Sequence, residues 1–256
     1  MTRAVPAVTR ALDILELFLT GEALSAPDIC GRSGLPRTTV HELLHTLLDR
    51  DFLATAPERP NHYRLGVRVF QLGGVFAGQL DLARDGQPIA AAVAARCAET
   101  VHLAVLDGVE VVYVVRIEST QPVRMVSSVG RRLPAHCTAV GKVLLAELAP
   151  AELDLRYRRR KLTAMTPRSI TTLAALKKET ARIREAELAT EFCESNEAVA
   201  CVAAPVRDHQ GETVAAMSIS VPITRWNAAR STELAAIVRD GARQLSGRLG
   251  FAIKGT

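Results

Sequence analysis

The segment from Leu24 to Leu53 constrains the fold of this 256-residue chain more than any other. Ser25 and Asp28 stand at the spacing of a capping box, which predicts the start of a short helix. Gly34 permits the left-handed conformation that a sharp turn between helices requires, and Pro36 suits the first position of a second helix. We therefore predict two short helices joined by a tight turn.

The second of these helices separates apolar from polar residues. Its apolar stripe repeats at helical spacing and consists of Val40, Leu43, Leu44, Leu47 and Leu48. Its other side carries Arg37, Thr38, Thr39, His41, Glu42, His45 and Asp49. Arginine and short polar side chains near the start of an exposed helix suit readout of base edges in the major groove of DNA. The pattern predicts a helix-turn-helix whose second helix binds DNA.

Elements on both sides of this segment complete a winged module. Thr9–Leu19 is predicted to form an amphipathic helix. Its apolar side would hold Leu12, Leu15 and Leu19. Asp51–Ala54 and His62–Leu65 are predicted strands around a turn at Ala56–Asn61, which is the pattern of a β-wing. The further residues expected at the DNA interface are Arg10, Ser25, Arg59, Asn61, His62 and Arg64, and those of the wing would contact phosphates.

The second helix also contains the pentapeptide HELLH at 41–45, which matches the HExxH pattern of zinc peptidases. Histidines at i and i+4 can bind zinc, and the glutamate between them can act as a general base. No HExxHxxGxxH continuation follows, and a third ligand would have to be Glu58 or His62. A zinc peptidase is therefore the alternative function, while the context favours DNA binding with no catalytic residue, metal or cofactor.

Composition narrows the remaining classes. No apolar run is long enough to span a membrane, and the N-terminal residues lack the apolar core and cleavage site of a signal peptide. The five cysteines are odd in number and include no CxxC pair, which favours free thiols in a reducing compartment. The spacing of His136, Cys137, Cys193 and Cys201 is irregular and indicates buried thiols rather than a metal cluster. We expect a cytoplasmic protein with no membrane partner.

The net charge of +5 is compatible with nucleic-acid binding, but the distribution of the charge does not support it directly. Residues 1–70 hold eight Lys or Arg and eight Asp or Glu, so the predicted DNA-binding module is formally neutral. The basic run at 156–161 is predicted to be a solvated surface rather than a second DNA contact. The DNA-binding hypothesis therefore depends on local geometry and not on overall charge.

The pattern changes after residue 80 to hairpin strands with interspersed helices, which indicates an α+β domain with a mainly antiparallel sheet. A linker helix at Gly66–Gly78, softened by Gly73-Gly74, precedes it. The predicted strands are Val101–Leu106, Glu110–Ile117, Pro122–Ser127, Ala198–Arg207 and Glu212–Val221, with tight turns at Asp107-Gly108 and His209-Gln210-Gly211. The predicted helices are Leu80–Cys97, Thr138–Leu148, Leu173–Thr190 and Asn227–Leu249.

Short motifs in a fixed order over nearly the whole chain resemble the IclR family of bacterial transcriptional regulators. In the N-terminal part they are RALDIL at 10–15, GLPRTTVH at 34–41 and YRLG at 63–66. Further along they are ETVHLA at 99–104, VGRRLP at 129–134, GKVLLA at 141–146 and CVAAPV at 201–206. No single motif is decisive, but their joint order and spacing make coincidence an inadequate explanation.

This resemblance implies a winged helix-turn-helix at 1–66, a linker helix at 67–80 and a GAF-like (profilin-like) effector-binding and oligomerisation domain at 81–256. It implies a transcriptional regulator, a repressor or an activator, that forms a homodimer or a dimer of dimers on a palindromic double-stranded operator. Small organic acids would be its effectors; the alternative is a domain that has lost its ligand and serves only for oligomerisation. The expected mechanism is an allosteric switch, in which the effector changes the arrangement of the two winged domains and so the operator affinity. Gly73-Gly74 is the expected point of transmission.

The resemblance also implies an effector pocket. The predicted helix at Thr138–Leu148 has free N–H groups at its start that suit a carboxylate. By resemblance, Ala139 and Val140 present these groups, and the remaining pocket residues are Met125, Glu191, Cys201, Ser218 and Ser220. From the residues alone, ordinary strand hydroxyls and a buried thiol remain the alternative for the serines and the cysteine.

Some residues depart from the family pattern. Glu42 stands where many relatives carry Arg, and a carboxylate can accept a hydrogen bond from cytosine, so different operator bases are expected. Glu191 replaces a frequent Asp, and Ala198 replaces a common Gly. Phe192 and Cys193 replace residues that are often acidic. A smaller or shifted pocket is the expected consequence.

Overall fold

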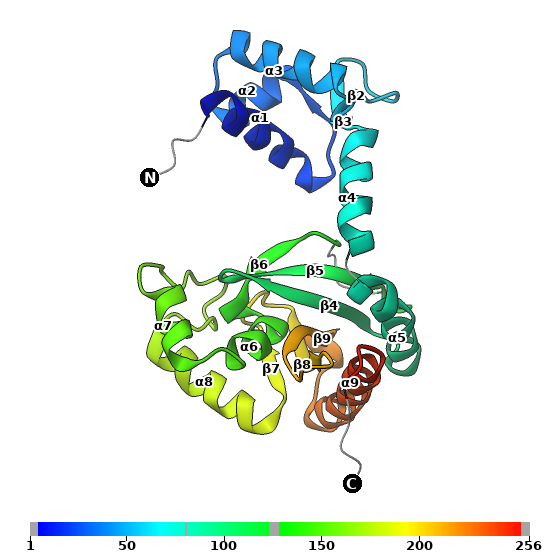
Figure 1. The fold of residues 1–256 in the computed structure, drawn as a ribbon, viewed down its shortest axis with the longest axis vertical. Helices are drawn as coiled ribbons and strands as arrows, with labels where there is room; N and C mark the ends of the chain where they lie inside the picture. The colour runs from blue at the N-terminus through cyan, green and yellow to red at the C-terminus, as the bar shows by residue number, and fades with distance from the viewer. Residues whose placement is uncertain (1–4, 80, 123–127, 252–256) are drawn as a thin grey trace. The chain divides into compact units, whose positions relative to one another are not determined.

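The computed structural model describes residues 5–79, 81–122 and 128–251, which divide into two compact units at 1–80 and 81–256 (Figure 1). Each unit has its own apolar core. Within the described ranges, no helix combines the length and the apolar character needed to cross a membrane. All five cysteines are free thiols.

The N-terminal unit is a winged helix-turn-helix. Its helices are α1 (Pro6–Glu16), the 3-10 turn η1 (Leu17–Thr20), α2 (Ala26–Ser33), α3 (Arg37–Asp49) and α4 (Val67–Gln79). Its strands are β1 (Leu24–Ser25), β2 (Leu53–Thr55) and β3 (His62–Leu65), which pair antiparallel in the order β1-β3-β2. The core contains Ile14, Phe18, Leu24, Ile29, Val40, Leu44, Leu47 and Leu53. The predicted fold of this part is confirmed.

The signals for the turn between α2 and α3 are confirmed in detail. The Ser25 hydroxyl accepts the Asp28 N–H at 3.4 Å, and Asp28 Oδ2 accepts the Ser25 N–H at 2.9 Å, which is a complete capping box. Gly34 ends α2 with a φ of 69°. The predicted start of the second helix is off by one residue. Pro36 has an extended ψ of 144° and is the N-cap residue, so Arg37 is the first helical residue.

The predicted apolar side of the first helix is wrong for Leu12 and Leu19, while Leu15 packs partly buried against the core as predicted. Leu12 and Leu19 are exposed, at 54% and 71%, whereas Ile14 and Phe18 are buried in the core. The segment is apolar at most positions, so several stripes compete for burial. The pair Ile14 and Phe18, one helical turn apart, occupies the core, and the tighter 3-10 turn begins at Leu17.

The C-terminal unit has a six-stranded antiparallel sheet in the order β6-β5-β4-β9-β8-β7. Its strands are β4 (Thr100–Asp107), β5 (Glu110–Ile117), β6 (Arg132–Pro134), β7 (Ala189–Phe192), β8 (Val199–Arg207) and β9 (Thr213–Pro222). The helices α5 (Asp81–Cys97) and α9 (Ala228–Arg248) cover one face, and α6 (Ala139–Ala146), α7 (Pro150–Tyr157) and α8 (Leu173–Ala186) lie on the other (Figure 1). Short 3-10 turns are η2 (Ala135–Cys137) and η3 (Ile223–Arg225). The predicted α+β class is confirmed.

Several elements of this unit differ from the sequence prediction. The helix expected to Thr190 ends at Ala186, because Glu187 turns left-handed with a φ of 48° and the chain then enters the edge strand β7. The elements α7, β6 and β1 were not predicted, since each is too short to show a clear period. Most of the strand predicted at Pro122–Ser127 lies outside the described residues.

A glycine permits the close packing that positions α6. A Cβ on Gly141 would lie 2.2 Å from the carbonyl oxygen of Ala135, so only a residue without a side chain fits this place. The start of α6 can therefore lie directly against η2. Thr138 caps this start by accepting the Gly141 N–H at 3.0 Å.

Candidate functional site

The predicted DNA-contacting residues of α3 share one solvent-facing side of the helix. Arg37, Thr38, His41, Glu42 and His45 are exposed, and Thr39 is half-buried. The opposite side of α3 packs into the core. The residues predicted to contact DNA therefore form a continuous polar face on a helix whose other side is buried.

The wing presents a second polar surface. Arg59, Asn61 and Arg64 are exposed and His62 is half-buried. The turn is closed by the Ala56 N–H bonded to the His62 carbonyl at 2.8 Å and by the left-handed Asn61, with a φ of 60°. The two remaining predicted residues differ: Arg10 is exposed on α1, whereas the hydroxyl of half-buried Ser25 is already engaged in the capping box.

The structure gives no support to a zinc peptidase. His41, Glu42 and His45 lie exposed on α3, and His45 Nδ1 lies 3.2 Å from Asp49 Oδ2. Among the residues that the structure describes, no group of three or more His, Cys, Asp or Glu side chains is arranged to hold a metal ion. The HELLH pentapeptide follows from the helical period, which places its His and Glu residues on the exposed side and its leucines toward the core.

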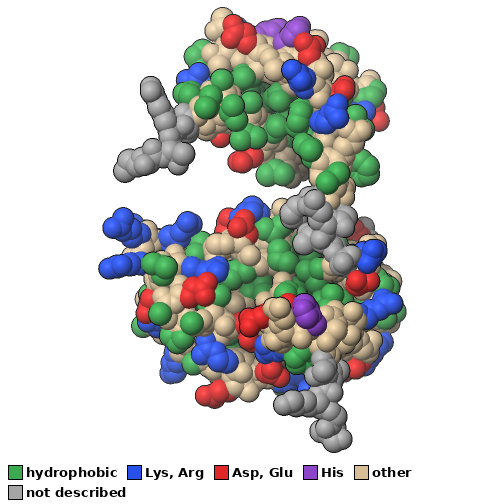
Figure 2. All heavy atoms as spheres, in the orientation of Figure 1, with side chains coloured by type: hydrophobic (Ala, Val, Ile, Leu, Met, Phe, Trp, Pro, Cys, Tyr) green, Lys and Arg blue, Asp and Glu red, His purple; other side chains and the backbone are tan. Residues whose placement is uncertain are grey.

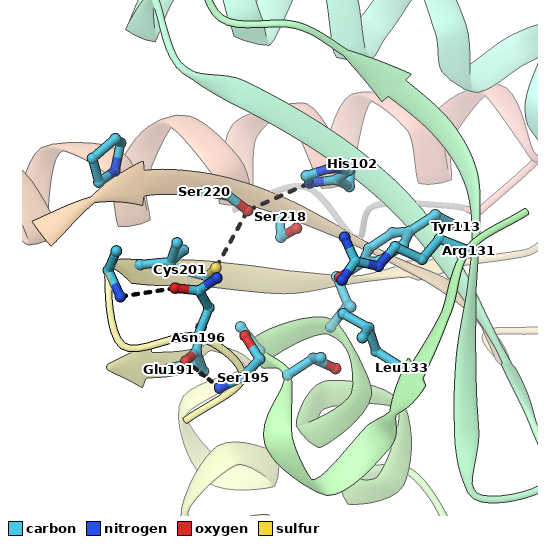
Figure 3. Close-up of a pocket in the computed structure, with 16 residues that line it drawn as sticks. His102, Tyr113, Arg131, Leu133, Glu191, Ser195, Asn196, Cys201, Ser218 and Ser220 are labelled. Atoms are coloured by element: carbon cyan, nitrogen blue, oxygen red, sulfur yellow. Dashed lines mark hydrogen bonds between the residues drawn. The ribbon is translucent and has the colours of Figure 1, made fainter. Parts of the chain in front are cut away.

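A cavity of about 300 Å³, here called the C-terminal cavity, lies in the second unit (Figure 3). Of the residues predicted for an effector pocket, it is lined by Ala139, Val140, Glu191, Cys201, Ser218 and Ser220. The seventh, Met125, lies outside the described residues. Ala198, which departs from the family pattern, is also in the lining. Further lining residues that the sequence did not single out are His102, Tyr113, Arg131, Leu133, Thr138, Ser195, Asn196, Val199 and Pro222.

One end of this cavity is the start of α6. The N–H groups of Ala139 and Val140 belong to the first turn, where no preceding helical carbonyl is available as a partner. The helix dipole places partial positive charge at the same end. Arg131 brings a cationic side chain to the lining. This combination suits an oxyanion such as a carboxylate.

A second part of the lining is polar and uncharged. Ser220 Oγ lies 3.4 Å from His102 Nδ1, and the imidazole packs against the ring of Tyr113 with centroids 4.7 Å apart. Burial, with the charges of Arg116 and Arg131, lowers the pKa of His102 to about 3. Burial raises the pKa of Tyr113. Both groups are therefore neutral near pH 7 and offer hydrogen bonds without charge.

Glu191 is a buried carboxyl group in the lining. Its Oε1 accepts the N–H groups of Glu194 and Ser195, the latter at 3.0 Å. Among the described residues Oε2 has no hydrogen-bond partner. Burial raises the pKa of Glu191, because the charged form loses its hydration. A polar group of a bound molecule could satisfy this second oxygen.

The missed residues carried a partial signal in the sequence. His102 interrupts the apolar strand Val101–Leu106, and a polar side chain on a buried strand requires a partner. Ser195 and Asn196 gave no such signal, because they lie in an irregular segment between β7 and β8. Their place in the lining follows from the tertiary structure alone.

A winged helix-turn-helix joined to a domain with a polar cavity defines the class of DNA-binding regulators that carry a ligand-binding domain. Comparison with known proteins specifies the class further. The family described as "IclR helix-turn-helix domain" matches residues 7–57, and "Bacterial transcriptional regulator IclR C-terminal" matches residues 76–247. The chain belongs to the IclR family of bacterial transcriptional regulators.

Individual relatives agree over nearly the full length. The HTH-type transcriptional regulator XynR of Escherichia coli is 34% identical, covering 96% of this chain and 98% of the relative. A regulator structure from Rhodococcus (RHA06195) has a TM-score of 0.82 at 28% identity, covering 96% of this chain and 98% of that one. An IclR homolog from Microbacterium hydrocarbonoxydans, complexed with 4-hydroxybenzoate, has a TM-score of 0.80 at 26% identity, covering 95% and 98%.

Proposed function

We propose that this DNA-binding transcriptional regulator changes its operator affinity when a small organic acid binds in the C-terminal cavity. The observation that carries the proposal is the combination of the α6 start with the neutral hydrogen-bonding groups of His102 and Ser220 around one cavity. The first suits a carboxylate, and the second suits the polar remainder of such a molecule. The relative bound to 4-hydroxybenzoate supports this class of ligand.

We assign operator contact to the polar face of α3, in the major groove, and phosphate contact to the wing. Arg37 and Arg64 are the exposed cations best suited to these two tasks. Glu42 on the same face would accept a hydrogen bond from a cytosine. No catalytic step enters this proposal, and the matched relatives are transcriptional regulators.

We further propose a homodimer, or a dimer of dimers, on a palindromic operator. The N-terminal unit exposes apolar side chains over α1 (Figure 2), including Val8 and Leu12, and others on α4, including Phe70 and Val75. Exposed apolar side chains that gather on one helix, unlike single scattered ones, are typical of a protein interface. A dimer would present two α3 helices to two half-sites, as a palindrome demands.

In this scheme residues 1–66 bind DNA, and residues 67–80 transmit the effect of ligand binding to them. Residues 81–256 bind the effector and form the oligomer. Effector binding need change operator affinity by only about 1–3 kcal/mol to alter occupancy five- to hundred-fold. Such a protein acts where the chromosome lies, in the bacterial cytoplasm. We assign it a repressor role.

The test is fluorescence anisotropy of the purified protein on duplexes from the intergenic region upstream of its own gene. We expect saturable binding that exceeds binding to a scrambled duplex and weakens as salt rises. Titration of 4-hydroxybenzoate and a series of aliphatic and hydroxylated acids should then shift the affinity. Binding that never exceeds the scrambled control would contradict operator recognition, and a tight complex that no acid shifts would contradict the effector proposal.

A further inference from the structure

A buried lysine lies in α6, one turn after the helix start that lines the C-terminal cavity. Lys142 is 1% exposed, in a helix whose other residues are Gly, Ala, Val and Leu. Its Nζ lies 2.6 Å from Glu194 Oε1 and 3.8 Å from Glu179 Oε1. Burying a charged side chain is costly unless it is paired with an opposite charge. The buried position of Lys142 therefore depends on these two carboxylates.

The main partner, Glu194, belongs to the 193–198 segment between β7 and β8. This segment supplies Ser195 and Asn196 to the lining of the C-terminal cavity (Figure 3). Neither Lys142 nor Glu194 lines the cavity itself. The ion pair therefore connects one part of the cavity, the start of α6, to another, the 193–198 segment, from outside.

The 193–198 segment is held in an unusual conformation. Cys193 is a non-glycine residue with a φ of 59°, a region that L-residues seldom adopt. The Thr166 hydroxyl donates to the Cys193 carbonyl at 2.6 Å, and the Ser169 hydroxyl donates to the Glu194 carbonyl at 2.7 Å. Together with Lys142, these contacts maintain a strained backbone at the edge of the cavity. Strain of this kind is concentrated at binding sites whose geometry must be held.

We propose that the Lys142–Glu194 ion pair is a positioning device for effector binding, which holds the 193–198 segment against α6 at the separation that the effector requires. The inference rests on the proposed effector site and adds two residues that act on it without touching the ligand. Loss of either charge would release the segment and widen the cavity. A buried ion pair of purely structural value would change stability alone.

Cys201 reports on this segment without any ligand. It lies opposite Glu191 in the register of β7 and β8, and it lines the cavity. Because it is only 9% exposed, its alkylation requires the cavity to open. The variants are Glu194→Gln, Lys142→Met and their combination. The control is Glu99→Gln, which removes a buried carboxylate bonded to Arg225 at 2.6 and 2.7 Å outside the cavity lining.

The rate of Cys201 alkylation by iodoacetamide is measured on the full chain by peptide mass spectrometry, together with the melting temperature. We expect Glu194→Gln and Lys142→Met to raise the rate at least about tenfold, as a tenfold shift in a local opening equilibrium would. Glu99→Gln should lower the melting temperature and leave the rate within about twofold of the original protein. Rates unchanged in both variants, or raised equally in the control, would overturn the proposal.

A second measurement uses 4-hydroxybenzoate as the probe and operator anisotropy as the readout. We expect both variants to need about tenfold more probe for the same response, which corresponds to about 1.4 kcal/mol of binding free energy. Their operator affinity without probe should be unchanged. If the probe does not change the operator affinity of the original protein, 4-hydroxybenzoate is excluded as an effector. The alkylation rates then still decide whether the ion pair holds the segment. A response with equal potency in all variants would contradict positioning.

Discussion

The Cys201 thiol donates a hydrogen bond to the Ser220 hydroxyl, with Sγ and Oγ 3.3 Å apart, in the lining of the C-terminal cavity. The same Ser220 oxygen lies 3.4 Å from His102 Nδ1. Three side chains on three neighbouring strands thus form one continuous polar chain, and burial keeps the pKa of the thiol well above its usual range. This part of the cavity offers hydrogen-bonding groups without charge.

The first prediction concerns Ser220. Ser220→Ala removes the acceptor of the Cys201 thiol and a hydroxyl from the cavity lining, at a cost of about 1–3 kcal/mol if a ligand group shares that bond. Effector potency should fall by about tenfold or more, while effector-free operator binding stays the same. Ser246→Ala is the matched control, because that buried hydroxyl bonds the Ala242 carbonyl outside the C-terminal cavity. Equal loss of potency in the two variants would argue against a role in recognition.

The second prediction concerns pH and His102. Its pKa is about 3 in the folded chain, whereas the ordinary pKa of an exposed histidine is 6.5, so between these values the unfolded chain binds more protons. The stabilising contribution is complete above about pH 6.5 and is lost as the pH falls toward 3. The difference in unfolding free energy between the original protein and His102→Gln should therefore shrink below pH 6.5, by at most about 1.4 kcal/mol per unit. Urea unfolding at several pH values measures it, and a difference independent of pH would contradict the assignment.

The third prediction concerns Gly141. Gly141→Ala places a Cβ 2.2 Å from the Ala135 carbonyl oxygen, so α6 must move away from η2. We expect a loss of about 1–3 kcal/mol in unfolding free energy and a loss of effector response. Gly247→Ala in α9 is the control, because its Cβ meets no atom within 4 Å and should stabilise the helix by up to about 1 kcal/mol. A Gly141→Ala variant of undiminished stability would show that η2 and α6 can separate freely.

The fourth prediction concerns Gly73 and Gly74 in α4. A Cβ at either position meets no atom within 4 Å, so alanine fits both. The double variant should stabilise the helix by about 1 kcal/mol per site and stiffen the linker. We expect the effector to change operator affinity less than in the original protein. An unchanged effector response in the anisotropy titration would exclude these glycines as the point of transmission.

The fifth prediction concerns Arg37 at the start of α3. Arg37→Gln should weaken operator binding and, if the contact is to phosphate, reduce the slope of log affinity against log salt by about one. Arg182→Gln is the control, an exposed arginine of α8 paired with Glu179. Both variants are compared on the same duplex at several salt concentrations. An effect of Arg182→Gln as large as that of Arg37→Gln would point to general electrostatics instead of operator contact.

Local signals predicted the elements whose stability is decided within a few residues. The capping box of Ser25 and Asp28, the left-handed Gly34 and the tight turn after Asp107 all form as expected. The strand Glu110–Ile117 has the predicted limits. Short elements such as α7 and β7 were missed, because they exist only where a neighbouring element supplies their partners.

The winged helix-turn-helix, the antiparallel character of the second unit and the family could be predicted from the residues, because they follow from local capping, period and motif order. Long-range packing decided which stripe of the first helix is buried, since Leu12 and Ile14 are both apolar. It also decided that His102, Asn196 and Ser220 share one cavity. Residues so far apart in the chain meet only through strand pairing, and the Lys142–Glu194 pair depends on the same long-range packing.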